Sequence, residues 1–370
     1  MNTEEYEMQS MLTCIGNKRK LINIIKQIVE TEIKPKIDKD KLNIVDGFAG
    51  SSVVSRALSQ YSNNMYSNDL EPYSYIMAKC FLIKPTQEKQ LIIKQHIDSM
   101  NHLAENGPYV PGIITETYSP NDTSNPQEDE RCFYTKENAL RIDTLRKYIN
   151  DNVPEELFEY CITPLLIKAS IHTNTCGVFK GFYKNKKGIG AWGGEDGNAV
   201  CRITNPIVLE MPLWSDFDFK GSVYNKDINE LIDDLPNDID LIYYDPPYNQ
   251  HPYSSNYFML NIILKNELPP KISKVSGIPS NWTRSEYNYK KNERAINAMK
   301  ELINKSIQKS KYILISYNDE GIIKIDDWDK IFEGYDVTMY ETEYNTFRGS
   351  RNLKDRSDKV TEIMYLISDP

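Results

Sequence analysis

The first 90 residues alternate between helix-like and strand-like hydrophobic patterns. Apolar residues at helical spacing predict a helix over 17–30, and the apolar run 42–45 predicts a buried strand that ends in a tight turn. A helix is expected to begin at Ser51, and a second strand is expected over 64–67. Strands that alternate with helices are typical of α/β proteins with a parallel sheet.

Strand-like patterns return after residue 220. Four apolar or β-branched runs predict strands, and we expect the last two to pair as antiparallel strands at an edge of the sheet. The runs cover residues 240–244, 312–316, 337–344 and 360–367.

The stretch between these two parts has a different pattern of apolar and polar residues. Glycine, proline and polar residues without periodicity predict a surface loop over 105–130, and apolar spacing predicts a helix over 155–171. We therefore expect an α/β fold in which residues 1–90 and 219–370 form one sheet domain. Residues 91–218 are expected to form an inserted domain that is mainly helical or irregular.

The composition predicts a folded protein of the cytoplasm. Of 370 residues, 40% are hydrophobic and 26% are charged, and no apolar run approaches the roughly 18 residues of a membrane span. The acidic start of the chain is wrong for a signal peptide. Six cysteines lie scattered without a C-x-x-C pair, and the four histidines lack metal-ligand spacing. Neither a disulfide framework nor a metal site is predicted.

The formal net charge of −9 argues, taken alone, against a nucleic-acid partner, because phosphate binding favours basic surface. The charge is unevenly spread, however. Residues 131–202 carry eleven basic and eight acidic side chains, a local +3, so the remaining residues sum to −12. Basic, aromatic and glycine residues alternate over 174–187, and 344–356 form a second basic cluster. An acidic protein can thus offer DNA a basic surface.

The strongest single motif is Asp245-Pro246-Pro247-Tyr248, which follows the predicted strand 240–244. Ligands of open α/β sheets bind beyond the carboxyl ends of the strands. Two prolines stiffen the turn, so a carboxylate and a carbonyl can hold both hydrogens of an exocyclic amino group while Tyr248 stacks on a base. The alternative interpretation is a proline-rich turn with a helix-capping aspartate.

A glycine turn follows the first predicted strand, where Asp46 precedes Phe48, Ala49 and Gly50. Gly50 allows the backbone to approach a ligand closely. The turn lacks G-x-G-x-x-G, so a nicotinamide dinucleotide site is not predicted. Asp69 ends the next strand, where an acid suits hydrogen bonding to ribose hydroxyls; a helix cap is the alternative.

Together these motifs resemble the Dam-like D12 class (alpha group) of S-adenosylmethionine-dependent adenine-N6 DNA methyltransferases. The element Cys14-Ile15-Gly16-Asn17-Lys18, the glycine turn, Asp69, a long insertion and Asp-Pro-Pro-Tyr occur in the order of that class over 12–82 and 220–368. The resemblance implies a Rossmann-like, seven-stranded methyltransferase sheet, S-adenosylmethionine as the methyl donor, and a target-recognition role for the inserted domain.

The resemblance also implies roles for individual residues. Asp245, Pro246, Pro247 and Tyr248 would be catalytic. The residues placed at the donor are Cys14, Gly16, Asn17, Lys18, Asp46, Phe48, Ala49, Gly50, Asp69, Asp227 and Asp245. The sequence departs from the family in two places, because Ser52 stands where the turn usually ends in glycine and Cys14 stands where an aromatic residue is often found.

The implied reaction is direct methyl transfer to N6 of an adenine flipped out of duplex DNA. Tyr248 would stack on that base, whereas Tyr257 and Phe258 are expected in a helix core. His251 lies close to the motif in sequence and is a candidate for contact with the DNA backbone. The residues expected to contact DNA are Lys180, Tyr183, Lys184, Lys186, Lys187, Tyr253, Arg348 and Arg351.

Other functions stay open from the residues alone. Cytosine-N4 methylation uses nearly the same chemistry, although Asp245 favours adenine because serine is commoner at that place in the cytosine group. An RNA or protein amine methyltransferase, or a non-catalytic DNA-binding regulator on a methyltransferase scaffold, are further alternatives.

Double-stranded DNA is the expected partner, a cognate restriction endonuclease is a candidate partner, and no membrane contact is expected. We expect a monomer that is cytoplasmic and nucleoid-associated, of prokaryotic or phage origin.

Overall fold

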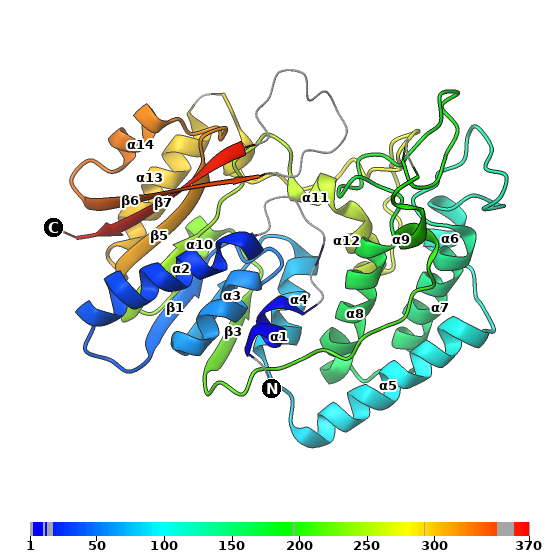
Figure 1. The fold of residues 1–370 in the computed structure, drawn as a ribbon, viewed down its shortest axis with the longest axis horizontal. Helices are drawn as coiled ribbons and strands as arrows, with labels where there is room; N and C mark the ends of the chain where they lie inside the picture. The colour runs from blue at the N-terminus through cyan, green and yellow to red at the C-terminus, as the bar shows by residue number, and fades with distance from the viewer. Residues whose placement is uncertain are drawn as a thin grey trace.

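The computed structural model describes residues 3–9, 12, 18–194, 197–291, 293–345 and 359–369. Within these residues, seven strands form one sheet in the order β3-β2-β1-β4-β5-β7-β6 (Figure 1). The strands are β1 (Leu42–Asp46), β2 (Ser62–Asn68), β3 (Lys220–Tyr224), β4 (Ile239–Tyr244), β5 (Ser310–Asn318), β6 (Asp336–Asn345) and β7 (Lys359–Ser368).

Strands β1 to β5 run parallel to one another, and β7 runs antiparallel to both β5 and β6. The expected α/β class and the antiparallel pair at the sheet edge are therefore confirmed. The edge strand is β6, and β7 lies between it and β5.

Helices cover both faces of the sheet. On one face lie α2 (Ile22–Ile28) and α3 (Val53–Leu58), and on the other lie α10 (Ile228–Asp234), α13 (Arg294–Ser306) and α14 (Ile325–Ile331) (Figure 1). Successive side chains of a strand point to opposite faces. On β5, Ile313 and Ile315 accordingly join the core under α13, while Leu314 joins the core under α2.

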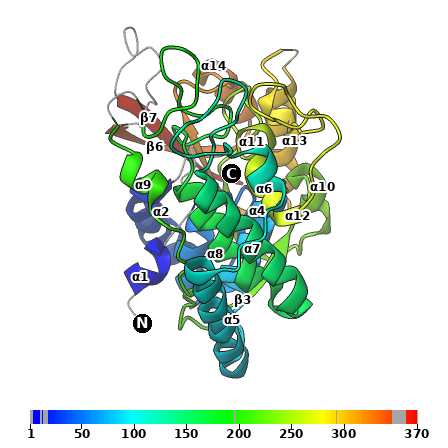
Figure 2. The same cartoon turned by 90° about the vertical axis from the view of Figure 1, so that its right-hand side faces the viewer.

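A second group of helices lies beside the sheet, and Figure 2 shows it from the front. It contains α5 (Gln87–Asn106), α6 (Ile113–Thr117), α7 (Lys136–Asn152), α8 (Phe158–Ile171) and α9 (Val200–Thr204). Its core also includes α4 (Pro72–Leu82) and α12 (Phe258–Lys265), so it draws residues from both predicted domains. The division at residues 91 and 218 stays a prediction.

Shorter segments complete the described chain. They are α1 (Thr3–Met8), α11 (Tyr253–Asn256), the 3-10 turns Lys18–Leu21, Lys34–Lys36, Ser59–Tyr61, Glu155–Leu157 and Glu286–Asn288, and the π turn Val29–Ile33.

Two predicted segments need correction. The helix expected over 17–30 is divided into a 3-10 turn, α2 and a π turn that extends to Ile33. The loop expected over 105–130 contains α6, because Ile114 and Tyr118 are buried in the helical core and hold this segment against it.

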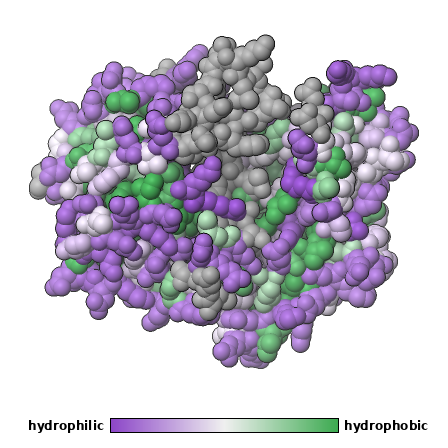
Figure 3. All heavy atoms as spheres, in the orientation of Figure 1, coloured by the Kyte–Doolittle hydropathy of each residue, from purple (hydrophilic) through white to green (hydrophobic). Residues whose placement is uncertain are grey.

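The face seen in Figure 3 is mostly hydrophilic outside the residues drawn in grey. Among the residues that the structure describes, no helix is both long and apolar enough to cross a membrane.

The strand order reverses between β1 and β4. From β1 the chain proceeds outward through β2 to β3, and it then returns to β4 on the other side of β1 and continues to β5. Such a reversal opens a crevice at the carboxyl ends of the two central strands, where ligands of open α/β sheets bind. The Asp46 turn and the Asp-Pro-Pro-Tyr motif follow those two strands.

Candidate active site

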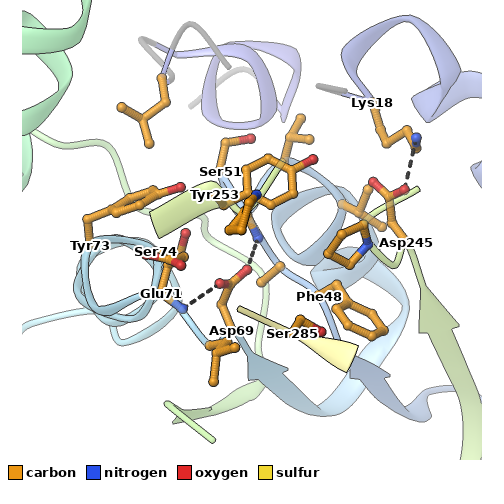
Figure 4. A pocket seen from close by; sticks show the side chains of 18 of the residues that line it. Lys18, Phe48, Ser51, Asp69, Glu71, Tyr73, Ser74, Asp245, Tyr253 and Ser285 are labelled. Carbon is orange, nitrogen blue, oxygen red and sulfur yellow. Dashed lines mark hydrogen bonds and ion pairs between the residues drawn. The ribbon is translucent and has the colours of Figure 1, made fainter. Parts of the chain in front are cut away.

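A cavity of about 890 Å³, including its part open to solvent, lies at the carboxyl ends of the central strands. The turn after β1, the end of β2 and the motif after β4 line it with Phe48, Ala49, Gly50, Ser51, Asp69, Glu71, Asp245 and Pro247 (Figure 4).

The turn after β1 depends on two left-handed residues, Gly50 with φ of 53° and Ser52 with φ of 62°. Left-handed backbone costs a residue with a side chain more than it costs glycine. Ser52 is also fully buried, and its hydroxyl oxygen lacks a hydrogen-bond partner. The strain explains why a related sequence would carry glycine at this position.

Asp69 ties this turn to the neighbouring strand. Its Oδ2 accepts a hydrogen bond from the Gly50 N–H at 2.7 Å, and its Oδ1 accepts one from the Glu71 N–H at 2.8 Å (Figure 4). Phe48 is held on the other side, edge-on against Tyr244 and Tyr287. The cavity wall is therefore fixed by contacts within the protein.

Asp46 and Asp227 lie outside the lining of this cavity. Asp46 is completely buried and accepts a hydrogen bond from the Ser55 hydroxyl at 2.6 Å. Asp227 caps α10 by accepting a hydrogen bond from the Asn229 N–H at 2.9 Å. Both side chains support elements beside the cavity, and their expected contacts with the donor stay a prediction.

Lys18 links Asp245 to a second carboxylate. Its Nζ lies 3.0 Å from Oδ1 of Asp245 and 2.8 Å from Oε1 of Glu362 on β7. The Ser316 hydroxyl on β5 donates a hydrogen bond to the same Glu362 oxygen at 2.5 Å. Lys18 and Glu362 are 3% and 1% exposed, so water does not screen this cluster. The position of the Asp245 carboxylate is thereby fixed from three strands.

Burial shifts the carboxylates of the cavity toward neutral pH. It raises the pKa of Asp245 to about 7, where Glu362 and Asp69 add to the shift and Lys18 opposes it. Burial also raises the pKa of Asp69 to about 6 and that of Glu71 to about 8. Asp69, Glu71 and Asp245 thus face the cavity beside Lys18, and the ionised forms of these acids suit a cationic ligand.

The aromatic residues after β4 divide between cavity and core. Tyr253 lines the cavity and stacks on Tyr257 with an interplanar angle of 16°. Tyr257 and Phe258 are buried, as expected for helix core. Tyr248 packs edge-on against Tyr317, and Lys18 Nζ lies 5.2 Å from the centre of its ring. Tyr248 therefore lies beside the ion-paired cluster.

The predicted DNA contacts lie on two parts of the described chain. Lys184, Lys186 and Lys187 are exposed on a tight turn closed by the hydrogen bond from the Gly188 N–H to the Asn185 carbonyl. Lys180 contacts His251, which precedes the cavity residue Pro252, and Tyr183 is half-buried. Five predicted residues fall outside the described residues, namely Cys14, Gly16, Asn17, Arg348 and Arg351.

The sequence interpretation missed several residues of the site, above all Glu71, Ser316 and Glu362. A signal existed for Glu362, because it is a single carboxylate inside the apolar run 360–367. Glu71 follows Asp69 by two residues at a strand end, which places a second acid near the same site. Ser316 has no sequence signal, since serine is common in strands of ordinary sheets.

Several known proteins are similar to this chain. The chain is 28% identical to the type II methyltransferase M.NlaIII of Neisseria lactamica over 365 residues, which cover 95% of the chain and 98% of the relative. It is 29% identical over 328 residues to M.CviAII of Paramecium bursaria Chlorella virus 1, covering 87% of both. It is 29% identical over 369 residues, or 95% of the chain, to the modification methylase StsI of Streptococcus sanguinis, and spans about half of that relative (51%).

The family model described as D12 class N6 adenine-specific DNA methyltransferase matches residues 15–331, which include both the glycine turn and the Asp-Pro-Pro-Tyr motif. The chain belongs to the D12 class of N6 adenine-specific DNA methyltransferases.

Proposed function

We propose that this protein transfers a methyl group from S-adenosylmethionine to N6 of an adenine flipped out of duplex DNA. The observation that carries the proposal is the placement of Asp245. Asp245 directly follows β4 at the point where the strand order reverses. Its side chain lines the cavity and is paired with the buried Lys18. The family to which the chain belongs supports adenine as the target base.

The residues of the cavity fit the proposed donor. Its acids outnumber its lysines and arginines, and Phe48 offers an apolar wall. When bound, S-adenosylmethionine supplies a methyl group activated by the positive charge on its sulfur. Asp69 and Glu71 would hold its polar groups at the β2 end of the cavity, and Phe48, Ala49 and Gly50 would enclose it at the β1 end.

The acceptor is positioned by the motif after β4. Asp245 and the main-chain carbonyl of Pro246 would accept hydrogen bonds from the two N6 hydrogens of adenine. The lone pair of that nitrogen would then be directed at the methyl group, and correct positioning accounts for much of the rate. Tyr253 lines the same cavity, so its ring is available to stack on the flipped base.

Proton removal follows transfer, because the methylated amino nitrogen carries an extra proton. A carboxylate whose pKa is about 7 accepts a proton near neutral pH, and Asp245 has that pKa and lies at the site. Lys18 pairs with Oδ1 of Asp245, so Oδ2 would be the oxygen that accepts the proton.

The biological setting belongs to the same proposal. Similar proteins bear the names of type II methyltransferases and modification methylases, and one of them is matched over 98% of its length. We infer that this protein protects DNA within a restriction-modification system, with a cognate endonuclease as its functional partner. A cytoplasmic location, at the nucleoid or in phage-infected cells, follows from that role.

The decisive experiment is to methylate a defined duplex with the purified protein, digest the DNA and weigh the nucleosides. N6-methyladenine is the expected product, and N4-methylcytosine or unmodified DNA would contradict the proposal. Asp245→Ala should abolish methylation while its thermal unfolding stays near that of the wild type. The matched control is Asp326→Ala on the exposed face of α14, which should keep full activity.

A further inference from the structure

Three basic side chains from distant parts of the sequence meet at the loop after Asp-Pro-Pro-Tyr. Lys180 Nζ lies 3.0 Å from Nδ1 of His251. The Arg284 guanidinium donates a hydrogen bond at 3.4 Å to the main-chain carbonyl of Gln250, the residue before His251. Asn288 anchors the same segment by donating to the carbonyl of Asn249 at 2.8 Å. Only the tertiary fold brings these groups together.

Lys180 and Arg284 bring two positive charges to this loop. No carboxylate among the described residues forms an ion pair with Lys180, His251 or Arg284, and Nε of Arg284 is buried without a hydrogen-bond partner. Besides burial, Arg284 lowers the pKa of Lys180, and both cations lower the pKa of His251. Like charges held this close favour binding of an anion between them.

Aromatic rings hold the arginine in place. The guanidinium carbon of Arg284 lies 5.3 Å from the ring centre of Trp282 and 4.9 Å from that of Tyr289. Arg294 covers Tyr289 at 3.6 Å. An arginine held by aromatic rings loses less conformational freedom when it binds a planar or tetrahedral anion. The indole of Trp282 is 39% exposed and borders the same surface.

The cluster adjoins the mouth of the cavity. Pro252 and Tyr253, which directly follow His251, line the cavity, as do Thr283 and Ser285 on either side of Arg284. In Figure 4, Tyr253 and Ser285 mark the segments that carry His251 and Arg284. A nucleotide whose base enters the cavity would therefore leave its phosphates near Lys180, His251 and Arg284.

We propose that Lys180, His251 and Arg284 form a phosphate clamp that binds a backbone phosphate next to the flipped nucleotide of duplex DNA. The proposal rests on the proposed function. Lys180 can only donate, so Nδ1 of His251 accepts and its Nε2–H remains for the phosphate. Two permanent cations and one N–H donor suit a single phosphodiester, which carries one negative charge and offers unesterified oxygens.

The test measures the affinity for a duplex that contains the target sequence over a series of salt concentrations, by fluorescence anisotropy. Lys180→Gln and Arg284→Gln should each weaken binding about 5-fold to 30-fold at moderate salt and lower the slope of log affinity against log salt by up to about 1. The matched control is Lys94→Gln, which removes one positive charge from α5, at the end of the molecule opposite α11 in Figure 1. It should change neither the affinity nor the salt slope.

A chemical substitution in the DNA locates the phosphate. Each phosphate that flanks the target adenine is replaced in turn by a neutral methylphosphonate. At one position, the replacement should weaken DNA binding by the wild-type protein about as much as the Arg284→Gln substitution does. At that same position, the replacement should weaken DNA binding by the Arg284→Gln variant at most slightly. Equal losses for wild type and variant at every flanking position would overturn the clamp.

The outcome is separable from the proposed function. Donor binding, measured by calorimetry, should be unchanged in Lys180→Gln and Arg284→Gln, because neither residue lines the cavity. If the wild type methylates adenine while both variants keep wild-type affinity and salt slope, the clamp is wrong and the proposed function stands. If the wild type forms no methyladenine but the methylphosphonate pattern is present, the proposed function fails and the phosphate site stands.

Discussion

Replacing Glu362 by glutamine should move the pH dependence of methylation, because it removes a buried negative charge near Asp245 with little change of shape. Lys18 Nζ lies 3.0 Å from one carboxylate and 2.8 Å from the other, so the two carboxylate oxygens are at most about 5.8 Å apart. At an effective dielectric constant of about 20, unit charges at that distance repel by about 3 kcal/mol, which corresponds to about 2 in pKa. The pKa of Asp245, about 7 in the wild type, should fall accordingly.

The direction follows from the proposed role of Asp245. Its carboxylate must be ionised to accept hydrogens from N6, so the rate falls as the pH drops through its pKa. Glu362→Gln should move this acidic limb to lower pH, whereas Lys18→Met removes the opposing positive charge and should move it to higher pH. The other ionisable groups near this cluster are Asp46, Asp69, Tyr243 and Tyr248, and none of the substitutions changes them.

The assay is the single-turnover rate of methylation at saturating donor and DNA between pH 5 and 9, which avoids limitation by product release. Glu341→Gln on the exposed edge strand β6 is the matched control and should leave the limb in place. An acidic limb at the same pH in the wild type and in Glu362→Gln would refute the reasoning. Shifts of equal sign in Glu362→Gln and Lys18→Met would also refute it, since structural damage would not reverse sign with charge.

Three further substitutions test the surroundings of the site. Ser52→Gly removes a left-handed non-glycine residue and a buried unpaired hydroxyl, so urea unfolding should show a gain of about 1 kcal/mol; a loss would contradict the strain. Gly221→Ala would place a Cβ 2.3 Å from the carbonyl oxygen of Leu82, so thermal unfolding should show a loss of about 1–3 kcal/mol, and an unchanged midpoint would contradict the close packing of α4 on β3. Donor affinity should rise as the pH passes about 8 and Glu71 ionises, and Glu71→Gln should remove that rise in calorimetry; a rise that persists in the variant would exclude Glu71 as its source.

Much of the fold was predictable from patterns of residues that are close together in the sequence. A strand exposes alternate residues to opposite faces and a helix repeats every 3.6 residues, so patterns within ten residues indicated β1, β2, β4, β5 and the antiparallel pair β6 and β7. Turn chemistry is equally local. The Asp46 turn and Asp-Pro-Pro-Tyr could therefore be placed at strand ends, and Phe48, Ala49, Gly50, Asp69 and Asp245 do meet in one cavity.

Local patterns were less successful where packing decides. The helix over 17–30 is interrupted by irregular turns, and α6 forms inside a stretch without periodicity because the helical core buries Ile114 and Tyr118. Asp46 accepts a hydrogen bond from Ser55, a contact that the sequence pattern did not indicate, and its expected contact with the donor stays a prediction. Residue type indicated the chemistry of this position, whereas the partners of its side chain depend on the fold.

The sequence by itself determined most of the strands, the strand-end motifs and the family, because each depends on residues that are neighbours along the chain. Only the tertiary structure decided which charges meet. Glu362 approaches Lys18 from the far end of the chain through the insertion of β7 between β5 and β6. Arg284 and Lys180 likewise meet at the loop of His251 from two separate segments. Electrostatic energy depends on distance in space and on burial, and neither quantity can be read from separation along the chain.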